Sequence, residues 1–396
     1  MKYLNYINYI YLSGYLEILP KNRLSEYFPA NFLDFIRRIT SITFKTFKAL
    51  FKNDTKKDLN KDWLIFQSNN NYETLKHFKN QNNVFVKIFD DLNFRFIFFY
   101  KIIYIIPLFI KLLFSRKIKL FLIFYISLGY YEEAFRVLKK SKTKRIFFAN
   151  DHNPIQRAFL KAANNLGLET FYFQHAHVTK YFPPLDFSVS FLDGQASYDI
   201  YKSIGSIRGK VELIGSMKFL KYKDIKIDRV ENSTIGIALN QNDDFILTEK
   251  LIKHININFK NFRIIVRKHP RDSREIDFNG EYLISNFNEE NVFNFLKKLS
   301  FLIAGNSSIL LEAALINVQP IYYYPNENNE FYDYYGFVKH KLCYEMIEIE
   351  DMIFEFCSSD LFNIVSYFNE SLSLNKINEV LQEHKITLSL DSIRCI

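Results

Sequence analysis

A buried strand runs into a helix at Phe301-Leu-Ile-Ala-Gly-Asn-Ser-Ser-Ile-Leu-Leu-Glu-Ala-Ala314. Upstream, Arg263-Ile-Ile-Val-Arg-Lys-His-Pro270 has the pattern of another buried strand, and it ends in a histidine and a proline. Both segments carry polar side chains just beyond a strand, and in an open α/β sheet ligands bind outside the carboxyl ends of the strands. The two segments therefore predict a parallel sheet with a ligand site at its carboxyl edge.

Strand patterns alternate with helix patterns twice along the chain, before and after a charged stretch at residues 221–231 that we interpret as a linker. Such alternation is typical of βαβ units and a parallel sheet. We therefore expect an α/β protein of two doubly wound, Rossmann-like domains that face a central cleft, with extra helices at both ends. The first domain is expected at residues 1–225, with a helical insertion at about 93–140, and the second at residues 232–396.

Apolar runs and turn residues predict the individual elements. The predicted strands are 63–66, 84–88, 145–149, 170–173, 187–192, 211–214, 234–239, 263–269, 282–284, 301–304 and 320–324. The predicted helices after the insertion are 154–166, 197–203, 245–259, 290–299, 307–316, 347–357, 359–370 and 374–384.

Composition and charge narrow the class of protein. The chain has 396 residues, of which 48% are hydrophobic, so it can bury a sizeable core in about two domains. Its net charge of +9 favours anionic partners, but no nucleic-acid motif accompanies the charge, so we expect no nucleic-acid partner. Cys343, Cys357 and Cys395 have neither metal-ligand spacing nor a disulfide framework, which favours a reducing, cytoplasmic compartment.

The most apolar region extends from Phe94 to Tyr130, but Lys101, Lys111 and the basic residues within 116–119 interrupt it. A membrane span needs about 20 apolar residues, so a span is the least favoured interpretation. Two others stay open. The region is either a buried helical pair, or a helix that lies in the plane of the inner membrane on its cytoplasmic face with Lys and Arg at the lipid surface.

Asn306, Ser307 and Ser308 stand at the start of the helix that follows the 301–304 strand. The first N–H groups of a helix have no intrahelical partner and the helix dipole is positive there, so an oxyanion fits. Serine is also a favoured N-cap without any ligand, and that alternative stays open.

His269 and Pro270 end the preceding strand. The proline fixes the chain direction, and the imidazole can donate to a phosphate or protonate it as it leaves. A histidine that bonds to backbone at a strand end is the alternative. Arg267 shares a strand face with His269, so it could pair with an acidic sugar or a phosphate, or be an ordinary exposed charge.

His-Pro followed by Ser-Ser in the C-terminal half resembles bacterial sialyltransferases, polysialyltransferases and related Kdo transferases. The resemblance covers mainly residues 233–325 and rests on these short motifs. It implies the GT-B architecture of two Rossmann-like domains and a CMP-activated acidic sugar as donor. The sugar would be moved to a glycan or lipid-linked glycan of a capsule or lipopolysaccharide.

The resemblance also implies roles for particular residues. His269 would contact or protonate the CMP phosphate, and Ser307 and Ser308 would bind it. A carboxylate would hold the ribose or cytosine, with Glu312, Glu290 and Glu289 as the candidates.

The N-terminal half lacks the Asp/Glu-Asp-Gly triplet of those sialyltransferases. Asp193-Gly194 is the nearest match, but no acid precedes it, and a turn is the simpler interpretation. Asn150-Asp151-His152-Asn153 follows the 145–149 strand, so we expect Asp151 or His152 in the cleft as a catalytic group, with an N-cap at Asp151 or Asn153 as the alternative.

Gln174-His175-Ala176-His177, together with the Pro-Pro-Leu that follows it, resembles the N-terminal halves of bacterial surface-polysaccharide transferases. Of the two histidines we expect one in the cleft and one packed, with His175 as the catalytic candidate. A shared metal is not expected, and no cofactor is implied beyond the nucleotide-sugar substrate.

Asn240-Gln241-Asn242-Asp243-Asp244 ends the first strand of the second domain. The amides of Asn240 and Gln241 could read a base or a sugar, and the carboxylates could be catalytic. The alternative is a solvated turn that caps the helix beginning at Phe245.

Three hypotheses follow from these patterns. The first is a metal-independent GT-B glycosyltransferase that uses a CMP-linked acidic sugar. The second keeps the architecture but changes the donor to a UDP-sugar, or to a CDP-alcohol in a phosphotransferase; a nucleotide-sugar epimerase is a further possibility on this fold. The third is a non-catalytic nucleotide-sugar-binding protein of the envelope machinery.

Overall fold

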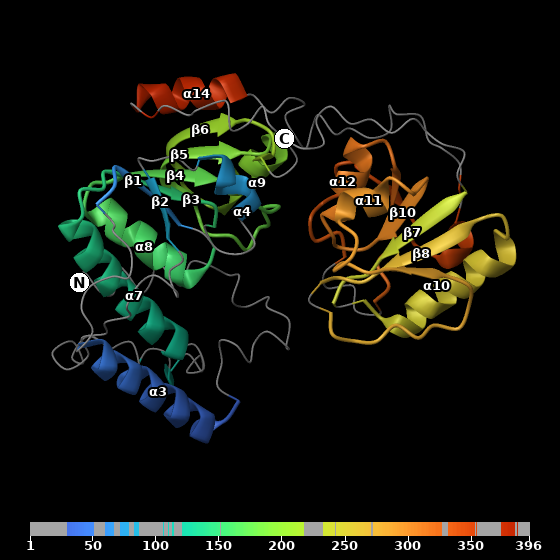
Figure 1. Ribbon diagram of the computed structural model, residues 1–396, viewed down its shortest axis with the longest axis horizontal. Helices are drawn as coiled ribbons and strands as arrows, with labels where there is room; N and C mark the ends of the chain where they lie inside the picture. Colours follow the sequence, from blue (N-terminus) through green and yellow to red (C-terminus); the bar gives the residue numbers. More distant parts are fainter. Residues whose placement is uncertain are drawn as a thin grey trace. The chain divides into compact units, whose positions relative to one another are not determined.

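The computed structural model of the protein (Figure 1) forms two compact units. Unit 1 comprises Met1–Asp193, Ser197–Lys218 and Ser373–Ile396, and unit 2 comprises Gly194–Ala196 and Phe219–Leu372. The structure describes residues 30–50, 60–66, 72–78, 83–86, 106, 110, 113–114, 121–150, 152–217, 233–241, 243–270, 272–326, 332–352, 354, 374–384 and 386.

Unit 1 contains a six-stranded parallel sheet in the order β2-β1-β3-β4-β5-β6. Its strands are β1 (Trp63–Phe66), β2 (Asn83–Val86), β3 (Arg145–Phe148), β4 (Glu169–Phe173), β5 (Asp186–Leu192) and β6 (Arg208–Leu213). Its helices are α3 (Phe32–Leu50), α4 (Tyr72–Leu75), η2 (Lys76–Phe78), α7 (Phe121–Lys140), α8 (Pro154–Asn165), α9 (Gln195–Ile204) and α14 (Leu374–Glu383).

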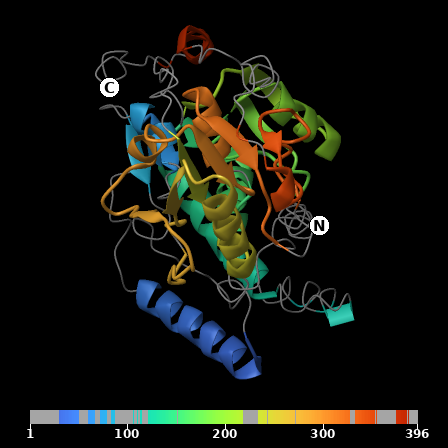
Figure 2. The same cartoon turned by 90° about the vertical axis from the view of Figure 1, so that its right-hand side faces the viewer.

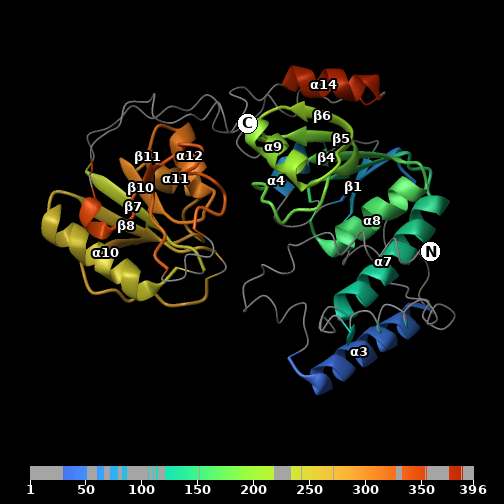
Figure 3. The same cartoon turned by 180° about the vertical axis from the view of Figure 1, so that it is seen from behind.

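Both faces of this sheet are covered, which is why its strands are continuous apolar runs. Alternate residues such as Leu64 and Phe148 pack with α7 and α8, which lie side by side (Figures 1 and 3). The intervening Phe147 and Phe173 lie on the other face, where their rings meet Phe78 of η2 at centroid distances of 5.6 and 4.5 Å. The period of two in the strands therefore builds two separate core layers.

Unit 2 contains a second six-stranded parallel sheet in the order β12-β11-β10-β7-β8-β9. Its strands are β7 (Thr234–Ala238), β8 (Arg263–Arg267), β9 (Leu283–Ser285), β10 (Phe301–Ala304), β11 (Gln319–Tyr322) and β12 (Tyr344–Glu345). Its helices are α10 (Phe245–Asn258), α11 (Val292–Leu296), α12 (Ile309–Leu315) and the short η6 (Ile349–Asp351).

The helices of unit 2 cover opposite faces of the sheet. Ile237 packs in the cluster that includes α10, whereas Leu302 packs in the cluster that includes α11 and α12 (Figure 3). Gly236 lets α11 and the turn after it approach closely, because a Cβ at this position would lie 3.0 Å from the ring of Phe295 and 2.3 Å from a methyl carbon of Leu299. The sheet is therefore doubly wound.

Strand order identifies the topology of each unit. Counted within unit 2 from β7, the order is third, second, first, fourth, fifth, sixth, which is the Rossmann order. The sheet of unit 1 has the other common doubly wound beginning, with the second strand outside the first and the third on its inner side. The predicted α/β class with two Rossmann-like units is confirmed, and two such units in one chain are the components of a GT-B protein.

Most predicted elements are present with ends shifted by one or two residues. The strands predicted at 63–66 and 301–304 have the predicted bounds. Where a helix was predicted at 347–357, the described residues hold only η6, and β12 was not predicted. The predicted linker at 221–231 and the helix at 359–370 lie outside the described residues.

Helix α14 belongs to unit 1, although the sequence placed the last helices with the second domain. Lys376 of α14 pairs with Glu212 of β6 at 2.7 Å, and Glu383 pairs with Lys210 at 3.3 Å. Its side chains Ile377 and Leu381 are fully buried, so apolar packing and these ion pairs hold the helix against residues far away in sequence, and no local pattern signals them.

Helix α3 lies apart from the strands of unit 1 in all three views (Figures 1, 2 and 3). It meets α7 through Phe35 and Phe121, whose ring centroids are 6.1 Å apart. None of the helices in the described part of the chain is both long and apolar enough to cross a membrane.

Candidate functional site

The switch point of the Rossmann order in unit 2 lies between β7 and β10, the first and fourth strands, where connections leave in opposite directions. Ala304 of β10 pairs with Ala238 of β7, which pairs with Arg267 of β8. Two residues further along each strand come Asn306, Asn240 and His269. These three residues therefore leave the sheet at the same level, and the outer two are separated by two strand spacings, about 10 Å.

A direct hydrogen bond bridges the switch point. The side-chain amide of Asn240 donates to the backbone carbonyl of Asn306 at 2.7 Å. The side-chain oxygen of Asn240 accepts from the N–H of Gln241 at 2.7 Å. The loop after β7 is thereby fixed against the loop that carries the two serines. Contact of the Asn240 amide with a ligand stays a prediction, because both ends of this amide already bond within the protein.

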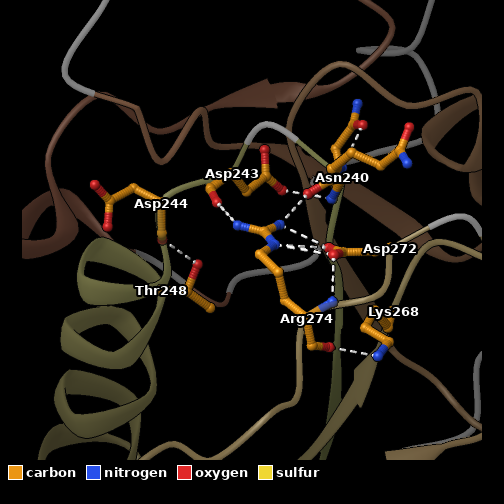
Figure 4. A network of polar contacts seen from close by, with 8 residues as sticks. Asn240, Asp243, Asp244, Thr248, Lys268, Asp272 and Arg274 are labelled. Atoms are coloured by element: carbon orange, nitrogen blue, oxygen red, sulfur yellow. Dashed lines mark hydrogen bonds and ion pairs between the residues drawn. The ribbon is translucent and has the colours of Figure 1, made fainter. Parts of the chain in front are cut away.

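Arg274, in the loop after β8, holds the loop after β7 in place through its guanidinium group (Figure 4). Its guanidinium donates to the backbone carbonyls of Asp243 at 2.7 Å and Asn240 at 3.0 Å. It also pairs with the carboxylate of Asp272 at 2.6 Å, and it stacks on the ring of Phe245 with 4.0 Å to the centroid. Burial disfavours the charge on Asp272, but the hydrogen bonds from Arg274 outweigh it and lower the pKa of Asp272 overall.

Asp243 is buried, so the alternative of a solvated turn does not hold for this residue. One carboxylate oxygen accepts the N–H of Asn240 at 2.7 Å, and the other has no hydrogen-bond partner. Burial raises the pKa of Asp243 to about 7, although the Asn240 hydrogen bond and the Arg274 charge oppose the shift. The next residue, Asp244, caps α10 by accepting from the N–H groups of Ile246 and Leu247, so the N-cap interpretation is confirmed at that position.

Ser307 and Ser308 lie half-buried between β10 and α12. Ser308 has helical dihedral angles and its hydroxyl makes no capping hydrogen bond, so it does not act as a conventional N-cap. The N–H of Ser307 donates to the carbonyl of Gly305 at 2.8 Å, and no described residue hydrogen-bonds to the Ser307 hydroxyl. The Ser307 hydroxyl is therefore the group of this motif that a ligand can use without displacing a described partner.

His269 is half-buried and Pro270 is exposed. The carbonyl of His269 accepts the N–H of Asp272 at 2.9 Å, which turns the chain back toward Arg274. The ammonium of Lys268 donates to the carbonyl of Arg274 and braces the same turn. His269 thus lies in a loop that is stabilised by contacts among Asp272, Lys268 and Arg274.

Arg267 is buried and its guanidinium bonds within the protein. It donates to the hydroxyl of Ser285 at 2.6 Å and to the carbonyl of Glu290 at 2.8 Å. The carboxylate of Glu290 accepts from Ser285 at 2.7 Å, and the charge of the buried Glu312 also acts on Arg267. Ligand contacts for Arg267, Glu290 and Glu312 stay predictions, and they would require these internal contacts to change.

Asn306 also joins β10 to the loop at residues 332–341. Its side-chain oxygen accepts from the hydroxyl of Tyr322 at 3.2 Å and from the N–H of Tyr334 at 3.0 Å. The carboxylate of Asp333 closes that loop by accepting from the N–H groups of Val338 and Lys339, both at 3.0 Å. Asn306 therefore holds three loops together, a role that the sequence did not reveal.

A second polar cluster follows β3 and β4 in unit 1. The rings of His152 and His175 are stacked with centroids 6.0 Å apart, so the structure brings two of the predicted catalytic residues together. The side-chain amide of Asn150 lies 3.5 Å from Nε2 of His152. His177 is buried whereas His175 is half-buried, and Asp151 lies outside the described residues.

Gln174 fastens this cluster to the end of β5. Its side-chain oxygen accepts the N–H of Asp193 at 3.0 Å, and its amide donates to the hydroxyl of Ser197 at 2.8 Å. Asn153 caps α8 by accepting from the N–H of Ile155 at 3.0 Å, which confirms the N-cap interpretation for Asn153. Across the described ranges, no three His, Cys, Asp or Glu side chains gather in a way that could hold a metal ion.

Comparison with known proteins adds only weak structural likenesses. No family model matches the chain, and no curated protein matches its sequence. The UDP-N-acetylglucosamine 2-epimerase of Rickettsia bellii is similar at a TM-score of 0.49 and 13% identity, covering 82% of this chain and 96% of that one. The UDP-GlcNAc 2-epimerase of Methanocaldococcus jannaschii gives 0.46 and 12%, covering 81% and 99%. HepE of Anabaena, in complex with UDP-glucose, gives 0.40 and 9%, covering 82% and 95%. With all three scores below 0.5, the fold assignment rests on strand order.

Proposed function

We propose that the protein is a glycosyltransferase that uses a nucleotide-activated sugar, and that unit 2 binds the phosphate of the donor at its switch point. The observation that carries this proposal is the Asn240–Asn306 hydrogen bond, which fixes the serine loop beside β7 at the level of His269. A crevice outside the carboxyl ends of the strands at a switch point is where doubly wound proteins bind nucleotides.

The chemistry of the loop residues fits departure of a phosphate. The acceptor hydroxyl attacks the anomeric carbon, a new carbon–oxygen bond forms, and the bond from that carbon to the phosphate oxygen breaks. A protonated His269 donates to the leaving phosphate, while Ser307, Ser308 and the N–H groups at the start of α12 stabilise its charge. The proton of the acceptor passes to a base, for which His152, His175 and Asp151 are the candidates.

The motif resemblance favours a CMP-linked acidic sugar as donor, and a glycan or lipid-linked glycan of a capsule or lipopolysaccharide as acceptor. UDP-sugars and CDP-alcohols are the competing substrates. A cytoplasmic location follows from the cysteine pattern alone and stays a prediction. A single experiment that offers these substrates separately distinguishes between them.

The test offers the purified full chain CMP-sialic acid, CMP-Kdo, UDP-N-acetylglucosamine, UDP-glucose and a CDP-alcohol, and measures nucleotide release and thermal melting. We expect release from at least one nucleotide-sugar, and a loss of at least about 100-fold in His269→Ala. His254→Ala changes a histidine on α10, away from the site, and should keep the activity. A raised melting temperature without turnover of any donor would support the non-catalytic alternative instead.

A further inference from the structure

Helix α3 presents large apolar side chains to solvent. Phe32, Leu33, Ile36 and Phe44 are 45–78% exposed. At 100° per residue these four positions fall within an arc of about 120°. Phe35 lies outside this arc and packs against Phe121 and the core of unit 1. One side of α3 is therefore held by the protein while an adjoining apolar side is uncovered.

A second apolar face of the same kind occurs within residues 106–114. Ile106, Ile110, Leu113 and Phe114 are helical and 46–83% exposed. Their sequence spacing of i, i+4, i+7 and i+8 is that of residues which share one face of an amphipathic helix. Of the 13 large apolar side chains that are exposed in the described residues, eight belong to these two faces.

The sequence around both faces is strongly basic. Residues 32–53 contain five Lys and Arg and one acid, Asp34, and residues 92–131 contain six Lys and Arg and no acid. The two stretches therefore contribute a net charge of +10. The rest of the chain has 41 basic and 42 acidic side chains, so its formal charge is −1. The excess positive charge of the whole protein thus resides in the two stretches that expose apolar helix faces.

Apolar faces bordered by an excess of cations match an anionic lipid surface. Exposed Arg37 on α3 adjoins the apolar arc, where it would meet lipid headgroups while the neighbouring phenylalanines enter the acyl boundary. The carboxylate of Asp34, the one acid of this helix, is paired with Arg37 and Arg38, so it offers little repulsion. A second copy of the chain would bring like charges together, which disfavours self-association through these faces.

We propose that the exposed faces of α3 and of residues 106–114 form a membrane-docking surface that seats unit 1 on an anionic lipid bilayer without crossing it. The surface belongs to neither polar cluster of the candidate site. It therefore stands or fails independently of the proposed catalytic function.

The test measures sedimentation of the full chain with vesicles of phosphatidylcholine alone, and with vesicles that also contain roughly 30 mol% phosphatidylglycerol. We expect sedimentation with the anionic vesicles only, and release when salt is raised to about 0.5 M, because charges there are screened over a few ångströms. Equal binding to both vesicle types, or to neither, would overturn the proposal.

Matched variants locate the surface. The double variant Phe32→Ser and Phe114→Ser removes one exposed aromatic from each face and should weaken binding at least about tenfold. The control Ile257→Ser and Ile347→Ser removes two equally exposed apolar side chains of unit 2 and should bind as the wild type does. Because all four residues are exposed, both variants should keep the wild-type melting temperature. If the wild type is instead a lipid-free dimer that the first variant dissociates, the faces are a protein interface and the proposal is wrong.

Discussion

Replacing Asp243 by asparagine should make the protein less sensitive to rising pH. The carboxyl group is 2% exposed, and burial raises its pKa from 3.8 to about 7. Its folded-state pKa lies above the unfolded one, so the folded state prefers the neutral acid. Below about pH 4 the group is neutral in both states, and as the pH rises through 7 the folded state must accept a buried charge.

The expected size follows from the shift. A difference of about three pKa units corresponds to about 4 kcal/mol between the extremes of pH, and to about 2–3 kcal/mol between pH 5 and pH 8. The asparagine side chain of the variant would keep an acceptor for the N–H of Asn240 but cannot ionise, so any constant cost of the substitution cancels when the two pH values are compared. The stability of Asp243→Asn relative to wild type should therefore rise by about 2–3 kcal/mol over this range.

Urea unfolding followed by circular dichroism at pH 5, 6, 7 and 8 measures this difference. Asp277→Asn is the matched control, because it makes the same substitution at an exposed acid of the same unit and keeps Asp243, so its pH profile should follow that of the wild type. The reasoning is refuted if the difference between Asp243→Asn and wild type stays constant within about 0.5 kcal/mol, or falls, as the pH rises.

Three further substitutions test the supports of the site. Arg274→Ala should destabilise the protein by about 2 kcal/mol or more, since it removes the guanidinium hydrogen bonds to Asp272 and to the carbonyls of Asn240 and Asp243, and Arg274→Lys should restore only part of this in urea unfolding. Gly236→Ala should cost about 1–3 kcal/mol of stability through overpacking, and the added change Leu299→Ala should recover part of that cost. An unchanged unfolding midpoint in Gly236→Ala would contradict the close approach of Leu299 to Gly236. Tyr322→Phe should cost about 1 kcal/mol of stability and speed amide exchange in the 332–341 loop. Equal exchange rates in the variant and the wild type would show that the Tyr322 hydroxyl does not stabilise this loop.

The core strands were predictable because burial on both faces makes them continuous apolar runs between turn residues. The strand at 301–304 shows this well, since its four residues are all buried and all apolar. Phe121–Lys140 was also predicted as helical, within the insertion, whereas α3 was expected only as one of the extra helices at the N-terminal end, without bounds. The strand β12 has two residues, too few to give any period.

The sequence predicted where the polar residues of the site lie, but not which groups they contact. Strand ends placed His269, Asn240 and Asn306 at one edge, and the register confirms that they leave the sheet at one level. The hydrogen-bond partners of these loops were not predictable. Arg274, for example, lies in a loop without periodicity and donates to the carbonyl of Asp243, which is 31 positions away in the sequence. The sequence left a catalytic and a solvated carboxylate open at Asp243 for the same reason, since its burial depends on contacts that only the folded loops create.

The central claim is that unit 2 holds a phosphate between His269 and Ser307. Isothermal titration of the full chain with CMP and cytidine, and with UMP and uridine, isolates the phosphate contribution as a ratio of affinities. We predict that one nucleotide binds at least about tenfold more tightly than its nucleoside, and that this ratio falls toward one in His269→Ala and Ser307→Ala but not in His254→Ala. A ratio near one in the wild type, or one that survives both substitutions, would contradict the account.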